Sequence, residues 1–334
     1  MKCFGRYINE IIDNKNIMFF AYSNSGFEIM IDVKNIDYKF EIKLFNRLIN
    51  KKSQFIKVYI DGELESKIEL KETNYSLSIL NLKEGKHIIK VIKINEIQYS
   101  RLGLICFEFN NVDIAKEEKN NKPKIEFYGD SVTCGFGILS NAKDDKTLME
   151  DEDSSISYAS LASEKLGFDF SLISYSGISL TDKLNISGVP FDILSIFDTS
   201  DLANKWDFNN FICDYVVINL GTNDDAAYKS LNDQNEKLLA LNSFKEKYIK
   251  FIDVLKSIHK NAQIICVSNI MNVLHVDLID VIKDVVNKEN IKHSNSIHYL
   301  ELVPNNDGAL THPSKEAHKI NADILADFVK SISK

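Results

Sequence analysis

Four short segments of the chain contain residues whose types suit acyl transfer. Ser131 lies in GDSVTCGFG, Gly177 in SYSGIS, Asn223 in NLGTND and His312 in THPS. A serine hydroxyl is a weak nucleophile at neutral pH until a base removes its proton, and histidine is the side chain whose ordinary pKa suits that task. Ser131 and His312 are therefore a candidate nucleophile and its base.

Acyl transfer also requires hydrogen-bond donors for the oxygen that becomes negative in the tetrahedral intermediate. A main-chain N–H beside Ser131, the N–H of Gly177 and the side-chain amide of Asn223 would supply three such donors. Glycine allows the main chain to approach a substrate closely, and asparagine donates without adding charge. We therefore expect Gly177 and Asn223 to bind the oxyanion.

The elements that must position these residues alternate between strand and helix patterns. Apolar runs predict strands at IEFYG, FSLISYS, DYVVINLG, QIICVSN and SIHYLEL, with helices near SSISYASLASEKLG, over 234–260, at VDLIDVIKDVVNKEN and from Pro313. This alternation predicts a mostly parallel sheet with helices on both faces. Ligands of such sheets bind beyond the carboxyl ends of the strands. Because three of the four residues follow such ends, we expect them to converge on one site.

The first part of the chain has a different pattern. Residues 17–110 contain many short runs in which apolar and polar residues alternate, such as FEIMIDV, KFEIKLF and FIKVYIDGE, separated by polar turns. Period-two alternation without a helical pattern predicts an antiparallel β-sandwich. A polar, charged segment that contains a proline follows at 110–124 and predicts a linker. We therefore expect domains at 1–112 and 122–334.

Composition limits the classes of function. A chain of 334 residues suits two domains, and its net charge of −8 argues against nucleic acid or an anionic membrane as the main partner. No run approaches the about 18 apolar residues of a membrane span, and the N-terminus lacks a signal-peptide pattern. The five cysteines are scattered without metal-ligand spacing, which predicts reduced thiols. We expect a cytoplasmic protein without metal or organic cofactor; the oligomeric state stays open.

The four segments resemble, in order, the signature blocks of the SGNH (GDSL-type) hydrolases. The chain also resembles carbohydrate esterase family 2, the acetyl xylan esterase-like enzymes, through GDSVTCGFG and VVINLGTND and through GRYINE, VYIDGE and WDFNNF. This resemblance covers nearly the whole chain. It implies an N-terminal jelly-roll β-sandwich, for which an accessory carbohydrate-binding role stays open, and a C-terminal α/β/α SGNH domain of the flavodoxin-like type.

The resemblance also implies an activity and roles for the four residues. Ser131 would attack an O-acetyl ester on a carbohydrate, His312 would be the base, and Gly177 and Asn223 would be the oxyanion donors. Two alternatives remain open. One is a carbohydrate-binding protein whose hydrolase site is degenerate, and the other is a lipid or thioester hydrolase on the same scaffold.

One position departs from the family pattern. SGNH enzymes usually have an aspartate two or three residues before the catalytic histidine, where this chain has Leu310 and Ala309. The nearest carboxylate upstream is Asp307, five residues before His312. A main-chain carbonyl can also fix the histidine tautomer by accepting a hydrogen bond from Nδ1–H. We favour a Ser–His dyad, and orientation of the ring by Asp307 is the alternative.

Other polar residues near these segments have simpler explanations. We expect Asp130 and Asp224 to shape their turns, Cys134 to be a buried thiol, and His318 to be structural. The acidic run at 149–155 lacks the ligand spacing of a calcium loop and is interpreted as a solvated helix start. Three aromatic residues are assigned either to the site or to the core: Tyr128, Phe136 and Trp206.

Overall fold

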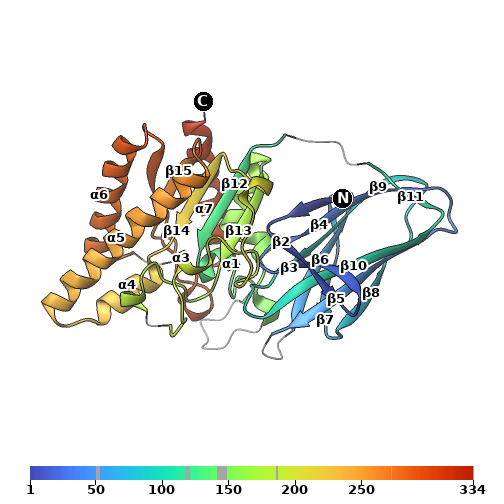
Figure 1. Ribbon diagram of the computed structural model, residues 1–334, viewed down its shortest axis with the longest axis horizontal. Helices are drawn as coiled ribbons and strands as arrows, with labels where there is room; N and C mark the ends of the chain where they lie inside the picture. Colours follow the sequence, from blue (N-terminus) through green and yellow to red (C-terminus); the bar gives the residue numbers. More distant parts are fainter. Residues whose placement is uncertain (50–52, 117–120, 141–148, 186, 272, 334) are drawn as a thin grey trace. The chain divides into compact units, whose positions relative to one another are not determined.

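The computed structural model describes residues 1–49, 53–116, 121–140, 149–185, 187–271 and 273–333. The chain divides into two compact units, Met1–Asn121 with Ser200–Lys205 and Lys122–Thr199 with Trp206–Lys334 (Figure 1). The segment Ser200–Lys205, predicted within the second domain, thus belongs to the first unit. Residues 117–120 of the predicted linker lie outside the described residues.

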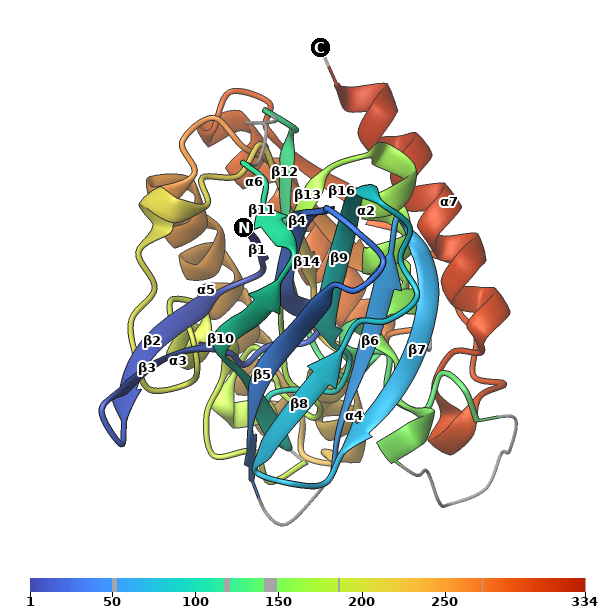
Figure 2. The same cartoon turned by 90° about the vertical axis from the view of Figure 1, so that its right-hand side faces the viewer.

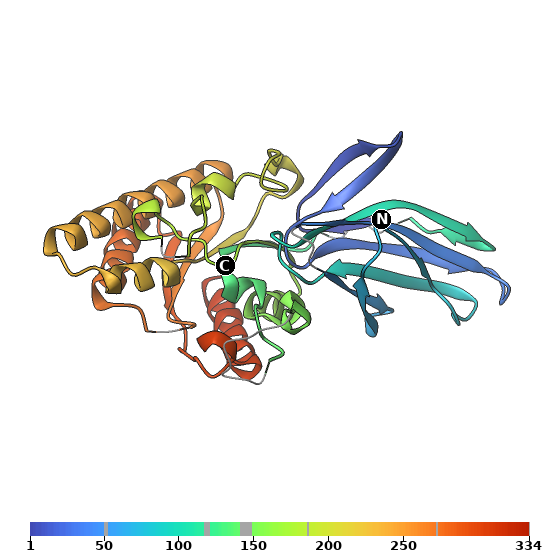
Figure 3. The ribbon, with the colours of Figure 1, turned by 90° about the horizontal axis from the view of Figure 1, so that it is seen from below.

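The first unit consists of two antiparallel sheets, as the alternating pattern predicted (Figure 2). One has the order β1 (Lys2–Phe4), β4 (Ser25–Val33), β9 (Gly85–Lys93), β6 (Gln54–Ile60) and β7 (Glu63–Leu70), with β11 (Val112–Ile114) paired to β4. The other has the order β2 (Tyr7–Ile12), β3 (Lys15–Phe20), β10 (Ser100–Asn110), β5 (Lys39–Leu48) and β8 (Asn74–Ser78). The strands begin earlier than the predicted residue 17, and the β2–β3 hairpin is clear in Figure 3.

Alternation along the strands explains the core of this unit. Successive residues of a strand point to opposite faces of a sheet, so Phe27, Ile29 and Ile31 of β4 lie on one face. They share a single buried apolar cluster with Phe40 and Ile42 of β5, which belongs to the other sheet. The two sheets therefore pack around one core, which is the arrangement of a sandwich.

The second unit is built on a five-stranded parallel sheet, which confirms the predicted parallel sheet. Its order is β13 (Asp169–Ser174), β12 (Lys124–Gly129), β14 (Tyr215–Asn219), β15 (Gln263–Ser268) and β16 (Ile297–Glu301). In chain order this is second, first, third, fourth and fifth, the flavodoxin-like order. The direction of connection reverses next to β12, which places the expected ligand site beyond the end of that strand.

Helices cover both faces of this sheet, because its strands are apolar on both sides. On one face α2 (Tyr158–Leu166) and α7 (Lys315–Ile332) pack together, and the ring of Tyr158 lies 6.1 Å from that of Phe127 in β12. On the other face α5 (Gln234–Ile258) packs with α6 (Val276–Lys292), and Phe251 lies 5.2 Å from Tyr128 of β12 (Figure 1). Across the described residues, the helices are too short or too polar to cross a lipid bilayer.

The shorter elements lie in the connections. They are α1 (Ser131–Cys134), η1 (Met149–Asp151), η2 (Ser154–Ile156), η3 (Asp182–Leu184), α3 (Ile193–Ile196), η4 (Phe208–Asn210), α4 (Thr222–Ser230) and η5 (Ala309–Thr311). The prediction that Pro313 lies in the first turn of the last helix is wrong. Helix α7 begins at Lys315, because Ser314 caps it by accepting a hydrogen bond from the N–H of Ala317 at 3.3 Å.

Candidate active site

Three strands of the parallel sheet end side by side. Gly129 at the end of β12 is in register with Ser174 of β13 and with Asn219 of β14. The carboxyl ends of parallel strands share one edge of the sheet. Residues of interest follow these three ends after two, three and four positions respectively: Ser131, Gly177 and Asn223.

A tight strand-to-helix turn holds Ser131 at this edge. Asp130 caps α1, and its Oδ1 accepts a hydrogen bond from the N–H of Val132 at 3.0 Å, which confirms that Asp130 braces the turn. Gly129 must be glycine, because a Cβ there would lie 2.1 Å from Oγ1 of Thr133. Ser131 is 9% exposed, so the turn presents a largely buried serine.

The acidic run at 149–155 packs against the turn that carries Ser131. Asp153 donates its N–H to the carbonyl oxygen of Gly135 at 3.2 Å, and a Cβ on Gly135 would lie 2.6 Å from the carbonyl oxygen of Asp153. Glu152 and Asp153 are 2% and 1% exposed. The predicted helix start is confirmed, because Asp153 caps η2 by accepting a hydrogen bond from the N–H of Ser155 at 3.1 Å. The predicted solvation is wrong for residues 152–155, because the main chain packs tightly against the turn that carries Ser131.

The structure brings Ser131 and His312 together. Nε2 of His312 lies 2.8 Å from Oγ of Ser131, and its Nδ1 lies 3.2 Å from the carbonyl oxygens of both Ala309 and Leu310. A carbonyl oxygen only accepts, so Nδ1 carries the proton of the neutral ring and the lone pair of Nε2 faces the serine hydroxyl. Burial lowers the pKa of His312 below its ordinary value of 6.5, and the two carbonyls oppose this effect.

Asp307 binds elsewhere. Its Oδ2 accepts a hydrogen bond from Nδ2 of Asn305 at 2.8 Å, and its N–H donates to Oδ1 of Asn305 at 3.2 Å. Among the described residues, no carboxylate is hydrogen-bonded to the His312 ring. The ring is therefore oriented by main-chain oxygens in this structure.

An unusual backbone conformation aims these two carbonyls. Leu310 and Thr311 both have left-handed conformations, with φ of +48° and +61°, which cost on the order of 1–3 kcal/mol each for residues with a side chain. Gly308 donates its N–H to the carbonyl oxygen of His312 at 2.8 Å, and a Cβ at position 308 would lie equally close, at 2.8 Å, to that oxygen. The loop is thus closed tightly enough to bring both carbonyls to one ring nitrogen.

Of the three aromatic residues left open, Phe136 lies at the site. Its ring centroid is 4.8 Å from that of His312, with a tilt of 47°. Tyr128 belongs to the core, where its hydroxyl donates to Oε2 of Glu126 at 2.6 Å. Trp206 is buried within the second unit. Phe136 therefore covers one side of the imidazole.

The expected oxyanion donors have the following surroundings. Gly177 has φ of +83°, and a Cβ there would lie 2.9 Å from Cβ of Ser187. The N–H groups of Ser131 and Gly177 donate no hydrogen bond to any described residue. Asn223 uses one hydrogen of its side-chain amide to bind the carbonyl oxygen of Ile178 at 2.8 Å, which leaves the second hydrogen for a further acceptor.

Two buried carboxylates lie close to these donors. Burial raises the pKa of Asp130 to about 6 and that of Asp224 to about 7, and hydrogen bonds from main-chain N–H groups oppose both shifts. Asp224 accepts from the N–H groups of Leu180 and Thr181, which lie in another loop, so the prediction that it shapes only its own turn is wrong. The loop that it binds belongs to the β13 connection, which the sequence did not indicate.

The neighbouring Cys134 and His318 are structural, as predicted. The thiol of Cys134 is buried and donates to Oγ of Ser174 at 3.2 Å. Nδ1 of His318 accepts a hydrogen bond from the N–H of Tyr158 at 3.0 Å, and burial lowers the pKa of His318 to about 3. Neither side chain is bonded to Ser131 or His312.

Two groups of side chains approach metal-ligand spacing within the described residues. In one, Glu126, Cys213 and His259 are buried, but Nδ1 of His259 accepts the N–H of Cys213 at 3.1 Å. The proton of that neutral ring is therefore on Nε2, the nitrogen that faces Glu126, so it has no lone pair for a metal. The second group consists of Asp253, Glu289 and His293, and its two carboxylates already bind the ammonium group of Lys292.

Comparison with known proteins identifies relatives of both units. Residues 7–117 match the family model described as carbohydrate esterase 2 N-terminal. The cellulase/esterase CelE of Acetivibrio thermocellus is 27% identical over 283 residues, which are 81% of this chain and 33% of that protein. An acetylxylan esterase/glucomannan deacetylase of Cellvibrio japonicus is 24% identical over 194 residues, 57% of this chain and 54% of that protein. The chain thus spans about a third and about half of the lengths of these two relatives.

The fold is shared with solved structures over nearly the whole chain. A family two carbohydrate esterase from Clostridium thermocellum, in complex with cellohexaose, superposes with a TM-score of 0.85 at 23% identity. The match covers 99% of this chain and 98% of that one. The two-unit architecture, with antiparallel sheets followed by a parallel sheet between helices, is therefore that of a known group of two-domain esterases.

Proposed function

The chain belongs to carbohydrate esterase family 2, and on this premise we propose that it is a serine-dependent carbohydrate O-acetyl esterase. The observation that carries the proposal is the distance of 2.8 Å between Oγ of Ser131 and Nε2 of His312. A hydroxyl and a neutral imidazole at hydrogen-bond distance form an activated nucleophile. The pair lies beyond the carboxyl end of β12, where the strand order predicts a ligand site.

The proposed reaction has two halves. Oγ of Ser131 attacks the carbonyl carbon of the acetyl ester while Nε2 of His312 takes the hydroxyl proton. The tetrahedral intermediate collapses when His312 returns that proton to the leaving sugar oxygen, which leaves an acetyl group on Ser131. Water then attacks the acetyl-enzyme with His312 as base. Acetate leaves and the serine hydroxyl is restored.

The negative oxygen of each tetrahedral intermediate needs donors. We assign the N–H groups of Ser131 and Gly177 and the side-chain amide of Asn223 to this role. The two N–H groups donate to no described residue, and one amide hydrogen of Asn223 is not used by Ile178. Loss of one such donor typically costs about 3–4 kcal/mol of transition-state stabilisation.

The base is proposed to act in a dyad. The two carbonyl oxygens at 3.2 Å from Nδ1 fix the tautomer and turn Nε2 toward Ser131. Each carbonyl also presents the negative end of its dipole to the imidazolium that forms during the reaction. Asp307 is not required in this scheme, because its carboxylate is hydrogen-bonded to Asn305.

The proposed substrates are acetylated oligo- or polysaccharides. The names of the relatives, acetylxylan esterase and glucomannan deacetylase, and the cellohexaose complex of a structural neighbour support this class. The intact Ser131–His312 pair argues against a binding protein with a degenerate site. It does not exclude a lipid or thioester hydrolase, and a comparison of acetyl with long-acyl esters distinguishes that alternative.

The first unit is proposed to be a jelly-roll sandwich with an accessory role in carbohydrate binding. A groove of about 690 Å³ lies over β3, β5, β8 and β10. Its lining offers amides and an ion pair that suit sugar hydroxyls, including Asn16, Asn74, Lys43 and Glu108. If the groove binds sugar, Asn74→Ala in the full chain lowers saccharide affinity measured by calorimetry in a Ser131→Ala background; unchanged affinity would contradict this role.

The central test is a panel of acetylated oligosaccharides, assayed for acetate release with the wild type, Ser131→Ala and His312→Ala. We expect both variants to lose turnover by at least about 10⁴-fold, as in other serine hydrolases. Labelling by an organophosphate should modify Ser131 and no other serine. A wild-type chain that binds saccharide but releases no acetate and takes no label would instead be a binding protein.

A further inference from the structure

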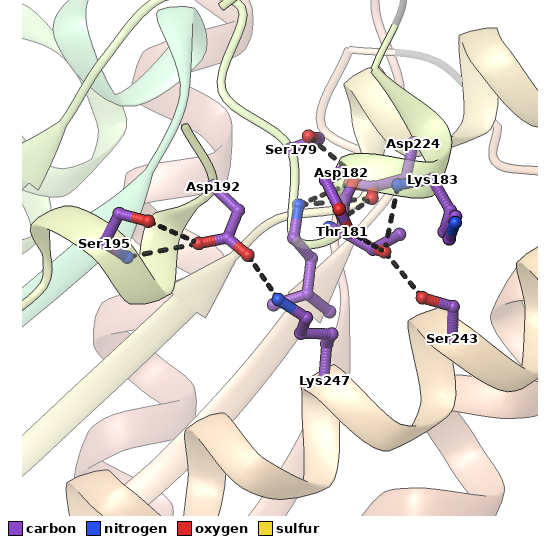
Figure 4. A network of polar contacts seen from close by, with 10 residues as sticks. Ser179, Thr181, Asp182, Lys183, Asp192, Ser195, Asp224, Ser243 and Lys247 are labelled. Atoms are coloured by element: carbon purple, nitrogen blue, oxygen red, sulfur yellow. Dashed lines mark hydrogen bonds and ion pairs between the residues drawn. The ribbon is translucent and has the colours of Figure 1, made fainter. Parts of the chain in front are cut away.

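Asp224 binds the connection that follows β13. Its carboxylate is fully buried in the first turn of α4. Oδ1 accepts hydrogen bonds from the N–H groups of Leu180 and Thr181, both at 3.1 Å, and Oδ2 accepts from that of Leu180 at 3.0 Å (Figure 4). Bonds from N–H groups to a carboxylate are stronger than those between neutral groups.

The residue before Asp224 binds the same loop. Asn223 donates its side-chain amide to the carbonyl oxygen of Ile178 at 2.8 Å. The first turn of α4 therefore holds the loop by Ile178, Leu180 and Thr181, one to four residues after Gly177. The loop with the Gly177 N–H and the helix turn with the Asn223 amide thus form one hydrogen-bonded unit.

Other contacts fix the far side of the loop to different elements. Oγ1 of Thr181 lies 2.7 Å from Oγ of Ser243 in α5 (Figure 4). The carbonyl oxygen of Ser179 accepts the N–H of Ile193 at 3.2 Å. These bonds tie the loop to α5 and α3. The bonds that join the loop to α4 are those of Asp224 and Asn223, and three of these four bonds are to the carboxylate of Asp224.

Burial of a carboxylate is energetically unfavourable, and a contact that is only structural does not require one. Desolvation disfavours its charged form, and the side chain of asparagine would fill the same space without charge. Oxyanion donors, in contrast, must be held within a few tenths of an ångström of their productive positions. Three hydrogen bonds that one carboxylate accepts from two consecutive N–H groups meet that requirement.

We propose that Asp224 is a positioning residue for the oxyanion site, acting through Gly177 and Asn223 rather than by contact with the substrate. The proposal rests on the esterase function proposed above. It goes beyond that function because it gives Asp224, which does not touch the substrate, a role in positioning the oxyanion donors.

The test compares Asp224→Asn with a matched control, Asp225→Asn. The asparagine oxygen can still accept from Leu180 and Thr181, but its NH₂ group replaces the oxygen that faces the N–H of Leu180. Asp225 is buried in the same helical turn, yet its carboxylate binds the N–H of His275 at 2.6 Å and the ammonium of Lys229 at 2.6 Å. The two variants thus make the same substitution at neighbouring buried positions of the same helical turn.

We expect Asp224→Asn to lower kcat by about 10- to 100-fold, a part of the 10²–10³-fold effect of removing a donor, with KM changed less than about threefold. Asp225→Asn should keep kcat within about threefold. Titration of Ser131 with an organophosphate gives the concentration of competent sites, so that kcat refers to folded enzyme. If Asp224→Asn does not fold, Asp224→Ser is measured in the same way.

A kcat per titrated site that falls equally in the two variants, or a change confined to KM, would overturn the proposal. The proposed function has its own control in Ser131→Ala. If Ser131→Ala retains turnover, the esterase assignment fails whatever Asp224→Asn does. If Ser131→Ala is inactive while Asp224→Asn equals Asp225→Asn, only the positioning role fails.

Discussion

Replacement of Asp307 tests how His312 is oriented. The perturbation is Asp307→Ala, with Asp307→Asn as a matched variant that keeps an acceptor for Asn305 and removes the charge. In a Ser–His–Asp triad, loss of the carboxylate lowers kcat by about 10⁴-fold, which corresponds to about 5.5 kcal/mol of activation free energy. A side chain outside the catalytic hydrogen bonds is expected to have a far smaller effect.

The structure gives the expected size of that effect. Asp307 accepts a bond from Asn305, whereas Nδ1 of His312 lies 3.2 Å from two main-chain oxygens. The bond between Asp307 and Asn305 is exposed, and its loss is expected to lower the stability of the loop by no more than about 1 kcal/mol. Because the His312 ring makes no bond to Asp307, we expect kcat to remain within about threefold of the wild type in both variants.

The assay is the initial rate of acetate release from an acetylated oligosaccharide at saturating concentration. Circular dichroism checks that the loop substitution leaves the fold intact, and His312→Ala sets the scale of a lost base. If Asp307→Ala and Asp307→Asn both lose kcat to an extent comparable to His312→Ala, the carboxylate serves the base and the dyad is refuted. Loss in Asp307→Ala alone would indicate that the acceptor for Asn305, not the charge, supports the loop.

Three further outcomes are expected. The acid limb of kcat/KM should have its midpoint below pH 6.5, because burial lowers the pKa of His312 and only its neutral ring accepts the serine proton; a midpoint above pH 7 would contradict this. Gly308→Ala should lower kcat by about tenfold or more, because the new Cβ would lie 2.8 Å from the His312 carbonyl oxygen; unchanged kinetics would show that the loop tolerates it. His318 has a folded-state pKa of about 3, below the unfolded value of about 6.5, so its contribution to stability is present above pH 6.5 and is lost as the pH falls toward 3. Urea unfolding should show that His318 lowers the free energy of unfolding of the wild type by about 3 kcal/mol between pH 7 and pH 4.5. In His318→Gln, whose side-chain oxygen can still accept from the N–H of Tyr158, the fall over the same pH range should be smaller by about 3 kcal/mol.

The arrangement of the second unit could be predicted from local patterns. Apolar runs bounded by polar residues marked five strands, and helical spacing marked α5, α6 and α7, because strand and helix periodicities are properties of neighbouring residues. The ends of parallel strands meet at one edge, so the sequence also indicated that Ser131, Gly177 and Asn223 share an edge. Helix α4 was not predicted, because its sequence TNDDAAYKS has little apolar periodicity.

The sequence alone determined which residues could do acyl transfer and in what order the elements that carry them occur. Only the tertiary structure decided how those residues are held. Whether Asp307 or two carbonyls face Nδ1 depends on the left-handed conformations of Leu310 and Thr311, which no residue type there indicates. The burial of Asp153 and the bonds of Asp224 likewise depend on segments distant in the chain. Main-chain direction and long-range packing set these contacts, and neither is encoded in the spacing of neighbouring side chains.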